Sequence, residues 1–208
     1  MQPASTDHAR PFWQRALLVL IVILAALLVL ALFRAHLAAA PPAFHATAYD
    51  PPDQAPQFTL TDHTGAPRSL ADLRGSAVLL FFGYTHCPDV CPLTLSRLRD
   101  ALEAAGAGAG EARVLLVTVD PQRDTPDVLA AYVARFGDAV IGLTGDAEEL
   151  QAVYRAYGIH AQPGHDGAEP MHTSPVIGID REGQRRVVLR ADAPREQLRA
   201  DVETLLDL

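Results

Sequence analysis

Apolar and polar positions follow one another along this chain in a way that predicts strands separated by helices. Residues 77–82, 113–119 and 140–143 form nearly continuous apolar runs, as expected of strands that are buried on both faces of a sheet. Elsewhere apolar residues recur every three to four positions, which is typical of helices with one buried face. These helical stripes are Leu95, Leu98, Leu102 and Ala105; Val128, Leu129, Tyr132, Val133 and Phe136; Leu150, Val153, Tyr154 and Tyr157; and Leu198, Val202, Leu205 and Leu206.

Two further patterns complete the predicted domain. Residues 58–61 are typical of a strand that enters a turn. Residues 176–179, the turn 180–183 and residues 186–189 predict a closing hairpin ahead of the last helix. Strands that alternate with helices indicate an α/β domain with a parallel core, to which the hairpin adds antiparallel strands.

The first forty residues contain the pattern of a membrane anchor. Residues 16–33 hold no charge, Gly or Pro, and at about 1.5 Å per residue such a helix nearly crosses a hydrocarbon core roughly 30 Å thick. We therefore expect a transmembrane anchor at 16–33 behind a cytoplasmic tail at 1–15. A cleaved signal peptide with its cleavage site at Ala38-Ala39-Ala40 is the alternative, but the apolar part of a signal peptide usually runs about 7–15 residues.

The part of the chain after the anchor is expected to lie outside the cytoplasm. Residues 34–56 are rich in proline and predict a stiff tether, and residues 57–208 predict one domain. This topology places a single-pass protein in the bacterial inner (cytoplasmic) membrane, with its domain on the periplasmic side. Residues 41–208 carry 14 Arg and 24 acidic residues, a net charge of −10, which argues against nucleic-acid binding.

Cys87 and Cys91 are the only cysteines, and they directly follow the apolar run 77–82. If both lie in the first turns of a helix they project from one face, with Cα atoms about 6 Å apart, which suits a disulfide or two thiolates on one metal ion. The helix N-terminus favours thiolate. The alternative is that they are small core residues at the end of the Leu95 stripe. A thiol pair between strand and helix, with a late hairpin before a final helix, indicates a thioredoxin-like fold.

A selective metal site needs a third donor, and His172 is the best candidate because it stands just ahead of the predicted strand 176–179. Two sulfurs and one imidazole suit copper, and zinc is possible by ligand type. His160 and His165 lie nearby and weaken the assignment, and His86 is expected to tune the thiols instead of binding metal.

The segment after the strand 113–119 admits two interpretations. Thr125 and Pro126 fit a helix start, as N-cap and first helical residue. Asp120, Arg123 and Asp124 could lie near the thiols or shape a partner surface, and the sequence does not decide between these roles.

Several blocks, taken together and in order, resemble the SCO (SenC) family of copper-binding proteins of cytochrome c oxidase assembly. These blocks are residues 83–92, 120–126, 142–145 and 172–174, and the similarity extends over roughly residues 56 to 206. The resemblance implies a thioredoxin-like fold in which Cys87, Cys91 and His172 coordinate copper. It also implies delivery of copper to, or thiol reduction at, the binuclear copper centre of oxidase subunit II. Met171 stands where the family usually has Asp, and Pro175 is unusual for it.

Two functions follow from this pattern. The first is a membrane-anchored copper chaperone, whose partner is oxidase subunit II or another copper protein. The second is a thiol–disulfide oxidoreductase in which Cys87 attacks a partner disulfide and Cys91 resolves the mixed disulfide. A thiol peroxidase fits less well, because the threonine expected three residues before the nucleophile is absent from both cysteines.

Overall fold

A computed structural model describes residues 12–37, 43–108, 110–162, 171–172 and 175–208 of the chain, which divides into two compact units at Ala43/Phe44. The first unit contains α1 (Phe12–Leu37). Among the described residues, Ala16–Arg34 is the one helical stretch long and apolar enough to cross a membrane, with a mean hydropathy of 3.4. A signal sequence meets the same criterion, so this helix supports an anchor only weakly.

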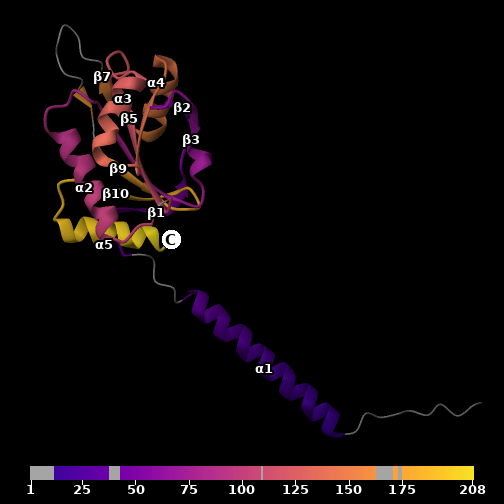
Figure 1. Cartoon of the computed structure of the whole chain (residues 1–208). Helices are drawn as coiled ribbons and strands as arrows, with labels where there is room; N and C mark the ends of the chain where they lie inside the picture. The colour runs from indigo at the N-terminus through magenta and orange to yellow at the C-terminus, as the bar shows by residue number, and fades with distance from the viewer. Residues whose placement is uncertain (1–11, 38–42, 109, 163–170, 173–174) are drawn as a thin grey trace, which may run out of the picture. The chain divides into compact units, whose positions relative to one another are not determined.

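Eight strands of the described second unit form one mixed sheet in the order β1-β10-β9-β4-β5-β6-β2-β3 (Figure 1). Its members are β1 (Thr47–Gln54), β2 (Thr59–Asp62), β3 (Pro67–Ser69), β4 (Ala77–Gly83), β5 (Ala112–Thr118), β6 (Val140–Thr144), β9 (Val176–Ile179) and β10 (Gln184–Leu189). Strands β4, β5 and β6 are parallel and fully buried at nearly every position, and β9 and β10 form the expected antiparallel hairpin. The prediction of a parallel core with an added hairpin is confirmed.

The helices begin and end where local chemistry predicts. They are α2 (Val90–Ala104), α3 (Pro126–Val133) with the 3₁₀ turn η2 (Ala134–Phe136), α4 (Ala147–Tyr157) and α5 (Arg195–Leu206), and a second 3₁₀ turn, η1 (Leu70–Leu73), follows β3. Asp146 and Glu149 form a capping box at the start of α4, and Gly158 ends that helix with a φ of 67°, a left-handed conformation that glycine adopts without strain. Helices between parallel strands and a hairpin before the last helix give the expected thioredoxin-like arrangement.

The proline-rich segment differs from its prediction as a tether. Strand β1 lies within residues 34–56 and pairs antiparallel with β10, and the compact unit begins at Phe44. The backbone N–H groups of His45 and Ala46 donate to the buried carboxyl group of Asp201 on α5, at 2.6 and 3.1 Å. Residues 44–56 are therefore part of the folded domain. They pair through the backbone, so the sequence has no pattern of apolar side chains that would predict a strand in this segment.

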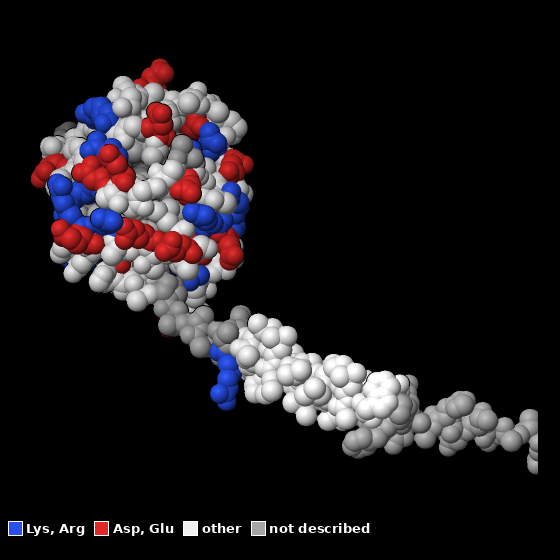
Figure 2. All heavy atoms as spheres, turned by 60° about the horizontal axis from the view of Figure 1, so that its bottom comes forward, with Lys and Arg blue, Asp and Glu red and all other residues white. Residues whose placement is uncertain are grey.

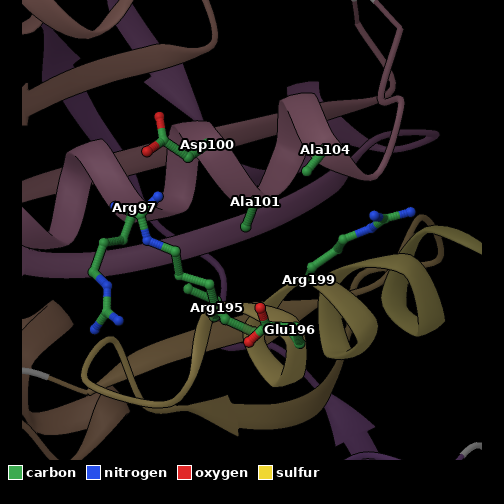
Figure 3. A pocket seen from close by; sticks show the side chains of 8 residues that line it. Arg97, Asp100, Ala101, Ala104, Arg195, Glu196 and Arg199 are labelled. Carbon is green, nitrogen blue, oxygen red and sulfur yellow. The ribbon is translucent and has the colours of Figure 1, made fainter.

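Helices α2 and α5 pack against each other on the sheet (Figure 1). A hollow of about 200 Å³ lies between them, and its lining includes the charged side chains of Arg97 on α2 and Arg199 on α5 (Figure 3). The guanidinium group of Arg97 donates to the carbonyl oxygens of Ala191 and Ala193, in the segment just before α5. These bonds tie the middle of α2 to the start of α5, away from the thiol end of α2.

Charged side chains of both signs are interspersed over the face of the folded unit seen in Figure 2. No broad basic patch appears on this face, and the unit carries more acidic than basic residues.

A buried carboxyl group organises the turn between β2 and β3. Burial raises the pKa of Asp62, but hydrogen bonds from Thr64, Arg68 and Ala66 outweigh burial and lower the pKa to about 2. Because the folded-state pKa lies below the ordinary value of 3.8, this carboxylate stabilises the fold above pH 4, and the contribution is lost as the pH falls towards 2.

We expect Asp62→Asn to lower the free energy of unfolding by about 2 kcal/mol at pH 7 and by less than about 0.5 kcal/mol near pH 2, where about half of wild-type Asp62 is itself protonated. Urea denaturation at both pH values measures the difference. The exposed Asp138→Asn is the matched control and should change neither value. A deficit for Asp62→Asn that stays at about 2 kcal/mol at pH 2 would contradict this electrostatic account.

Candidate metal and thiol site

The two thiols lie at the junction of β4 and α2, but only Cys91 is in the helix. Strand β4 ends at Gly83, and α2 begins at Val90, so Cys87 belongs to the intervening turn and Cys91 is the second helical residue. Both cysteines are free thiols; Cys87 is partly exposed, whereas Cys91 is only 1% exposed. The conditional prediction that both cysteines occupy the first helical turns is therefore right for Cys91 and wrong for Cys87.

The sulfur of Cys87 serves as a cap for the start of α2. Asp89 is the N-cap residue, but its side chain accepts no hydrogen bond from the helix. Instead the backbone N–H of Cys91 donates to Cys87 Sγ at 3.3 Å. Burial raises the pKa of Cys87, but hydrogen bonds from Cys91, from the Asp89 backbone and from the Tyr84 side chain outweigh burial, so the pKa is lowered. The turn thus favours thiolate at the more exposed cysteine.

Cys91 occupies the opposite chemical environment. Burial raises the pKa of its thiol to about 12, although a hydrogen bond from the Tyr84 backbone works against this, so Cys91 is protonated at neutral pH. Its sulfur packs against the end of β4, where a Cβ atom on Gly83 would lie 3.0 Å from Cys91 Sγ and 2.9 Å from a ring carbon of Phe81. Glycine at position 83 therefore makes room for the buried sulfur.

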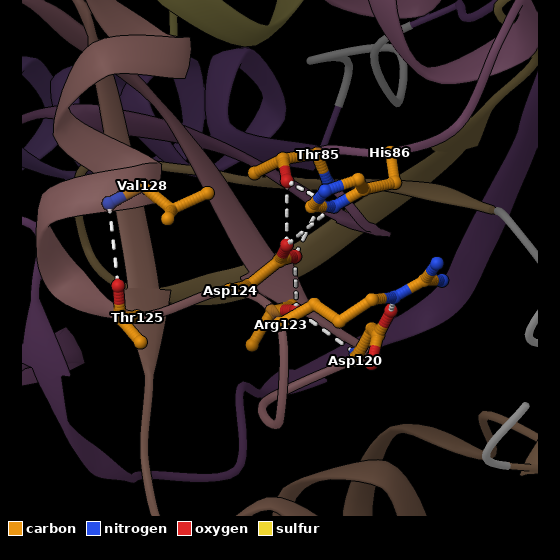
Figure 4. A network of polar contacts seen from close by, with 8 residues as sticks. Thr85, His86, Asp120, Arg123, Asp124, Thr125 and Val128 are labelled. Atoms are coloured by element: carbon orange, nitrogen blue, oxygen red, sulfur yellow. Dashed lines mark hydrogen bonds and ion pairs between the residues drawn. The ribbon is translucent and has the colours of Figure 1, made fainter.

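Asp124 holds the thiol turn against the end of β5. Its carboxyl group is completely buried and accepts three hydrogen bonds: from the backbone N–H of Thr85 at 3.1 Å, from Thr85 Oγ1 at 2.6 Å and from Thr118 Oγ1 at 2.6 Å. The His86 ring, 49% exposed, places Nδ1 3.7 Å from the same carboxyl group (Figure 4). Asp124, whose role the sequence left open, therefore positions the residues that lead into Cys87.

Asp120 and Arg123 form an ion pair next to this network (Figure 4). The guanidinium carbon of Arg123 lies 6.0 Å from the ring centroid of Tyr84, within reach of a cation–π interaction. The backbone N–H of Asp120 donates to Thr118 Oγ1 at 2.9 Å. This pair is therefore near the thiol turn, as one of the two interpretations expected, and it contacts the residue that donates a hydrogen bond to Cys87.

The architectural roles expected of Thr125 and Pro126 are observed. Thr125 is the N-cap of α3 and accepts a hydrogen bond from Val128 N–H at 3.4 Å, and Pro126 is the first helical residue. This start fixes α3 directly after Asp124 and so supports the network around the thiol turn.

The structure describes His172 only as backbone, in the two-residue strand β8 (Met171–His172). This strand pairs antiparallel with β7 (Ala161–Gln162), and His172 lies opposite Ala161. The side chains of His172 and Met171, and His165 with its loop, lie outside the described residues. Among the described side chains no group of three or more His, Cys, Asp or Glu is placed to hold a metal ion. The two cysteines are brought together, whereas His172 as a third ligand stays a prediction.

Sequence reasoning missed two threonines that organise the site. Thr118 ends β5, and Thr85 lies just beyond the end of the neighbouring parallel strand β4. The carboxyl ends of neighbouring parallel strands lie at the same edge of a sheet. Hydroxyl groups at these two strand ends could therefore have been predicted to lie near Asp124.

Comparison with known proteins agrees with this geometry. A family model described as SCO1/SenC matches residues 46–207. The chain belongs to the SCO1/SenC family. This SCO1/SenC protein is 45% identical over 109 residues to the mitochondrial SCO2 homolog of Bos taurus, a match that covers 51% of this chain and 41% of the bovine protein. The match thus spans less than half the length of that relative.

Solved SCO structures share the fold. The Bradyrhizobium japonicum ScoI structure with copper bound has 34% identity and a TM-score of 0.66, and the match covers 74% of this chain and 99% of ScoI. A second structure, of BsSco, is described as a member of the Sco family of cytochrome c oxidase assembly proteins. It has 22% identity and a TM-score of 0.64, and the match covers 81% of this chain and 99% of BsSco, which shows a common fold. The thioredoxin-like fold and the SCO family assignment are confirmed.

Proposed function

We propose that this protein is a copper chaperone that carries one copper ion on the sulfurs of Cys87 and Cys91 and the imidazole of His172. It passes the ion to a copper protein, subunit II of cytochrome c oxidase or another acceptor, during assembly. The observation that carries this proposal is the pair of free thiols at one strand–helix junction, with Cys87 Sγ 3.3 Å from the backbone nitrogen of Cys91. The copper-bound state of ScoI, at 34% identity, supports it.

The donor chemistry of the site fits copper. Two cysteine sulfurs and one imidazole form a soft donor set, which suits Cu(I) through the thiolates and Cu(II) through imidazole and thiolate. Cys87 is already biased towards thiolate, whereas Cys91 must release its proton when metal binds, so copper affinity should rise with pH. Asp124 and the Thr85 backbone hold the turn that presents Cys87.

The apolar helix Ala16–Arg34 supports a membrane location for the chaperone. We propose that it anchors the protein in the bacterial inner membrane, with residues 1–15 in the cytoplasm and the SCO domain on the periplasmic side. An anchored domain would meet its acceptor at the membrane surface, where oxidase subunits are assembled.

Thiol–disulfide exchange is the second candidate function, and one observation favours it. The pKa values of the two thiols are shifted in opposite directions, so the partly exposed Cys87 is poised to attack a disulfide and the buried Cys91 to resolve it. The two functions are compatible, because an acceptor must have reduced cysteines before it can receive copper.

Titration of the reduced full-length protein with Cu(I), in detergent and without oxygen, tests the chaperone function. We expect one tightly bound ion per chain, loss of tight binding in Cys87→Ala and Cys91→Ala, and at least tenfold weaker binding in His172→Ala. His160→Ala, an exposed histidine next to β7, is the matched control and should bind like wild type. Tight copper binding that persists in both cysteine variants would contradict the proposal. Unchanged copper affinity in His172→Ala would exclude His172 as a ligand.

A further inference from the structure

Two large apolar side chains are exposed at the start of α2. Val90 is 57% exposed and Leu93 is 55% exposed, and within the described part of the folded unit the other large apolar side chains are buried or half-buried. One exposed apolar residue is ordinary on a protein surface, but these two stand three positions apart and share one side of the helix. They form a small apolar patch, here called the Val90–Leu93 patch.

The Val90–Leu93 patch adjoins the sulfur of Cys87. The backbone nitrogen of Cys91 lies 3.3 Å from Cys87 Sγ. The Cα atom of Val90 is about 2.4 Å from that nitrogen, because one carbonyl carbon joins them, so it lies within about 6 Å of the sulfur. Side chains three positions apart are neighbours on a helix surface, which places Leu93 next to Val90. The patch therefore lies beside the more exposed of the two thiols.

Copper transfer requires a partner to cover this surface. In ligand exchange a bond forms between copper and an acceptor sulfur, and the bond between copper and Cys87 breaks. The proton of the acceptor thiol passes to the Cys87 sulfur, and the charge of the copper ion does not change. The acceptor sulfur and Cys87 must then reach the same copper ion, so the acceptor's surface contacts the residues that surround Cys87.

We propose that the Val90–Leu93 patch is a docking surface for the protein that accepts copper, and that apolar side chains next to the acceptor's cysteines pack on it. The inference rests on the proposed function and assigns part of its partner surface. Exposed apolar side chains cost free energy in water, and packing them against the acceptor recovers it only while the two proteins are in contact.

The charges around the patch disfavour two other occupants. Exposed side chains between positions 86 and 93 include Asp89 and no Lys or Arg, and residues 41–208 carry a net charge of −10. A segment that binds an anionic lipid surface combines apolar residues with Lys and Arg, which this one lacks. A symmetric dimer through the patch would bring two copies of Asp89 together and would cover Cys87. An acceptor protein is the occupant that leaves the thiol able to react.

The double variant Val90→Thr/Leu93→Gln tests the inference. The full-length protein is loaded with Cu(I) in detergent without oxygen, and transfer to the reduced, copper-free copper domain of oxidase subunit II is followed over a range of acceptor concentrations. We expect kcat/KM for transfer to fall about tenfold, mainly through a higher KM, because docking is weakened and the copper ligands are unchanged. Transfer to bicinchoninic acid, a small chelator that needs no docking surface, should proceed at the wild-type rate.

Ala104→Ser is the matched control, since Ala104 is an exposed apolar residue at the other end of α2 (Figure 3), and it should transfer copper like wild type. Wild-type transfer to subunit II that does not saturate, unchanged transfer in the double variant, or equal slowing towards the chelator would overturn the inference while the chaperone function stands. A dimer in detergent, or protection of Cys87 from iodoacetamide in vesicles with phosphatidylglycerol, would also overturn it if the double variant abolished the effect. If wild type binds copper independently of Cys87 and Cys91, the proposed function fails as well.

Discussion

Replacing Asp124 with Ala should lower the free energy of unfolding by about 3 kcal/mol. The buried carboxyl group accepts hydrogen bonds from the Thr85 backbone, the Thr85 hydroxyl group and the Thr118 hydroxyl group. Removing it leaves three donors without an acceptor, and each such loss costs about 1–3 kcal/mol before local rearrangement admits water. The loss should be accompanied by weaker copper binding, because Thr85 stands two residues before Cys87.

Urea denaturation and Cu(I) competition on the same samples check this expectation. Asp127→Ala is the matched control, since Asp127 lies on the exposed face of the first turn of α3 and accepts no hydrogen bond among those described for this helix. The control should lose no more than about 1 kcal/mol, the usual contribution of an acid near a helix N-terminus. Equal losses in the two variants would show that Asp124 does not hold the thiol turn.

The second large effect is selective alkylation of the two cysteines. At pH 7 iodoacetamide should modify Cys87 far faster than Cys91. The pKa of Cys87 is below its ordinary value of 9.0 and that of Cys91 is about 12, so the thiolate fractions differ by at least about a thousandfold. The more basic thiolate is the better nucleophile, which reduces the advantage to roughly fiftyfold, and burial of Cys91 increases it again.

Peptide mapping by mass spectrometry over time measures both rates. The alkylation rate at Cys87 should rise with pH, with the midpoint of the rise below pH 9, and then level off, because the thiolate is the reactive form. In concentrated urea the two cysteines should react at similar rates, since the hydrogen bonds and burial that separate their pKa values are lost. Comparable rates in the folded, reduced protein would contradict the environments described for the two sulfurs.

The sheet and helices were predictable because they are marked by burial. Apolar runs predicted β4, β5 and β6, and apolar stripes predicted α2 to α5, because both patterns identify the side chains that become buried. The bounds of these elements were predicted to within a few residues. Strand β1 was missed because its eight residues are almost all exposed and include Pro51 and Pro52. Its place in the sheet is decided by backbone pairing with β10, which leaves no pattern of side chains.

The site was predictable in its chemistry and less so in its geometry. The thiol pair and its place after a strand could be read from the sequence, but the helix start at Val90 excludes Cys87 and turns its sulfur into a cap. The buried role of Asp124 depends on contacts 39 residues apart in the chain, with Thr85. Leu93 is exposed and Leu95 is buried, a difference that depends on packing in three dimensions and that residue type does not report.

The position of β1 has a consequence for self-association. It covers β10, which would otherwise be an edge strand with a row of unpaired N–H and C=O groups open to another chain. Strand β1 is itself a poor template, because Pro51 and Pro52 lack N–H donors, Asp50 and Asp53 carry charge and the pairing is irregular between Ala48 and Asp53. A domain shortened to begin at residue 57 would expose β10 and should dimerise or aggregate as its concentration rises, whereas one that keeps Phe44 onward should stay monomeric.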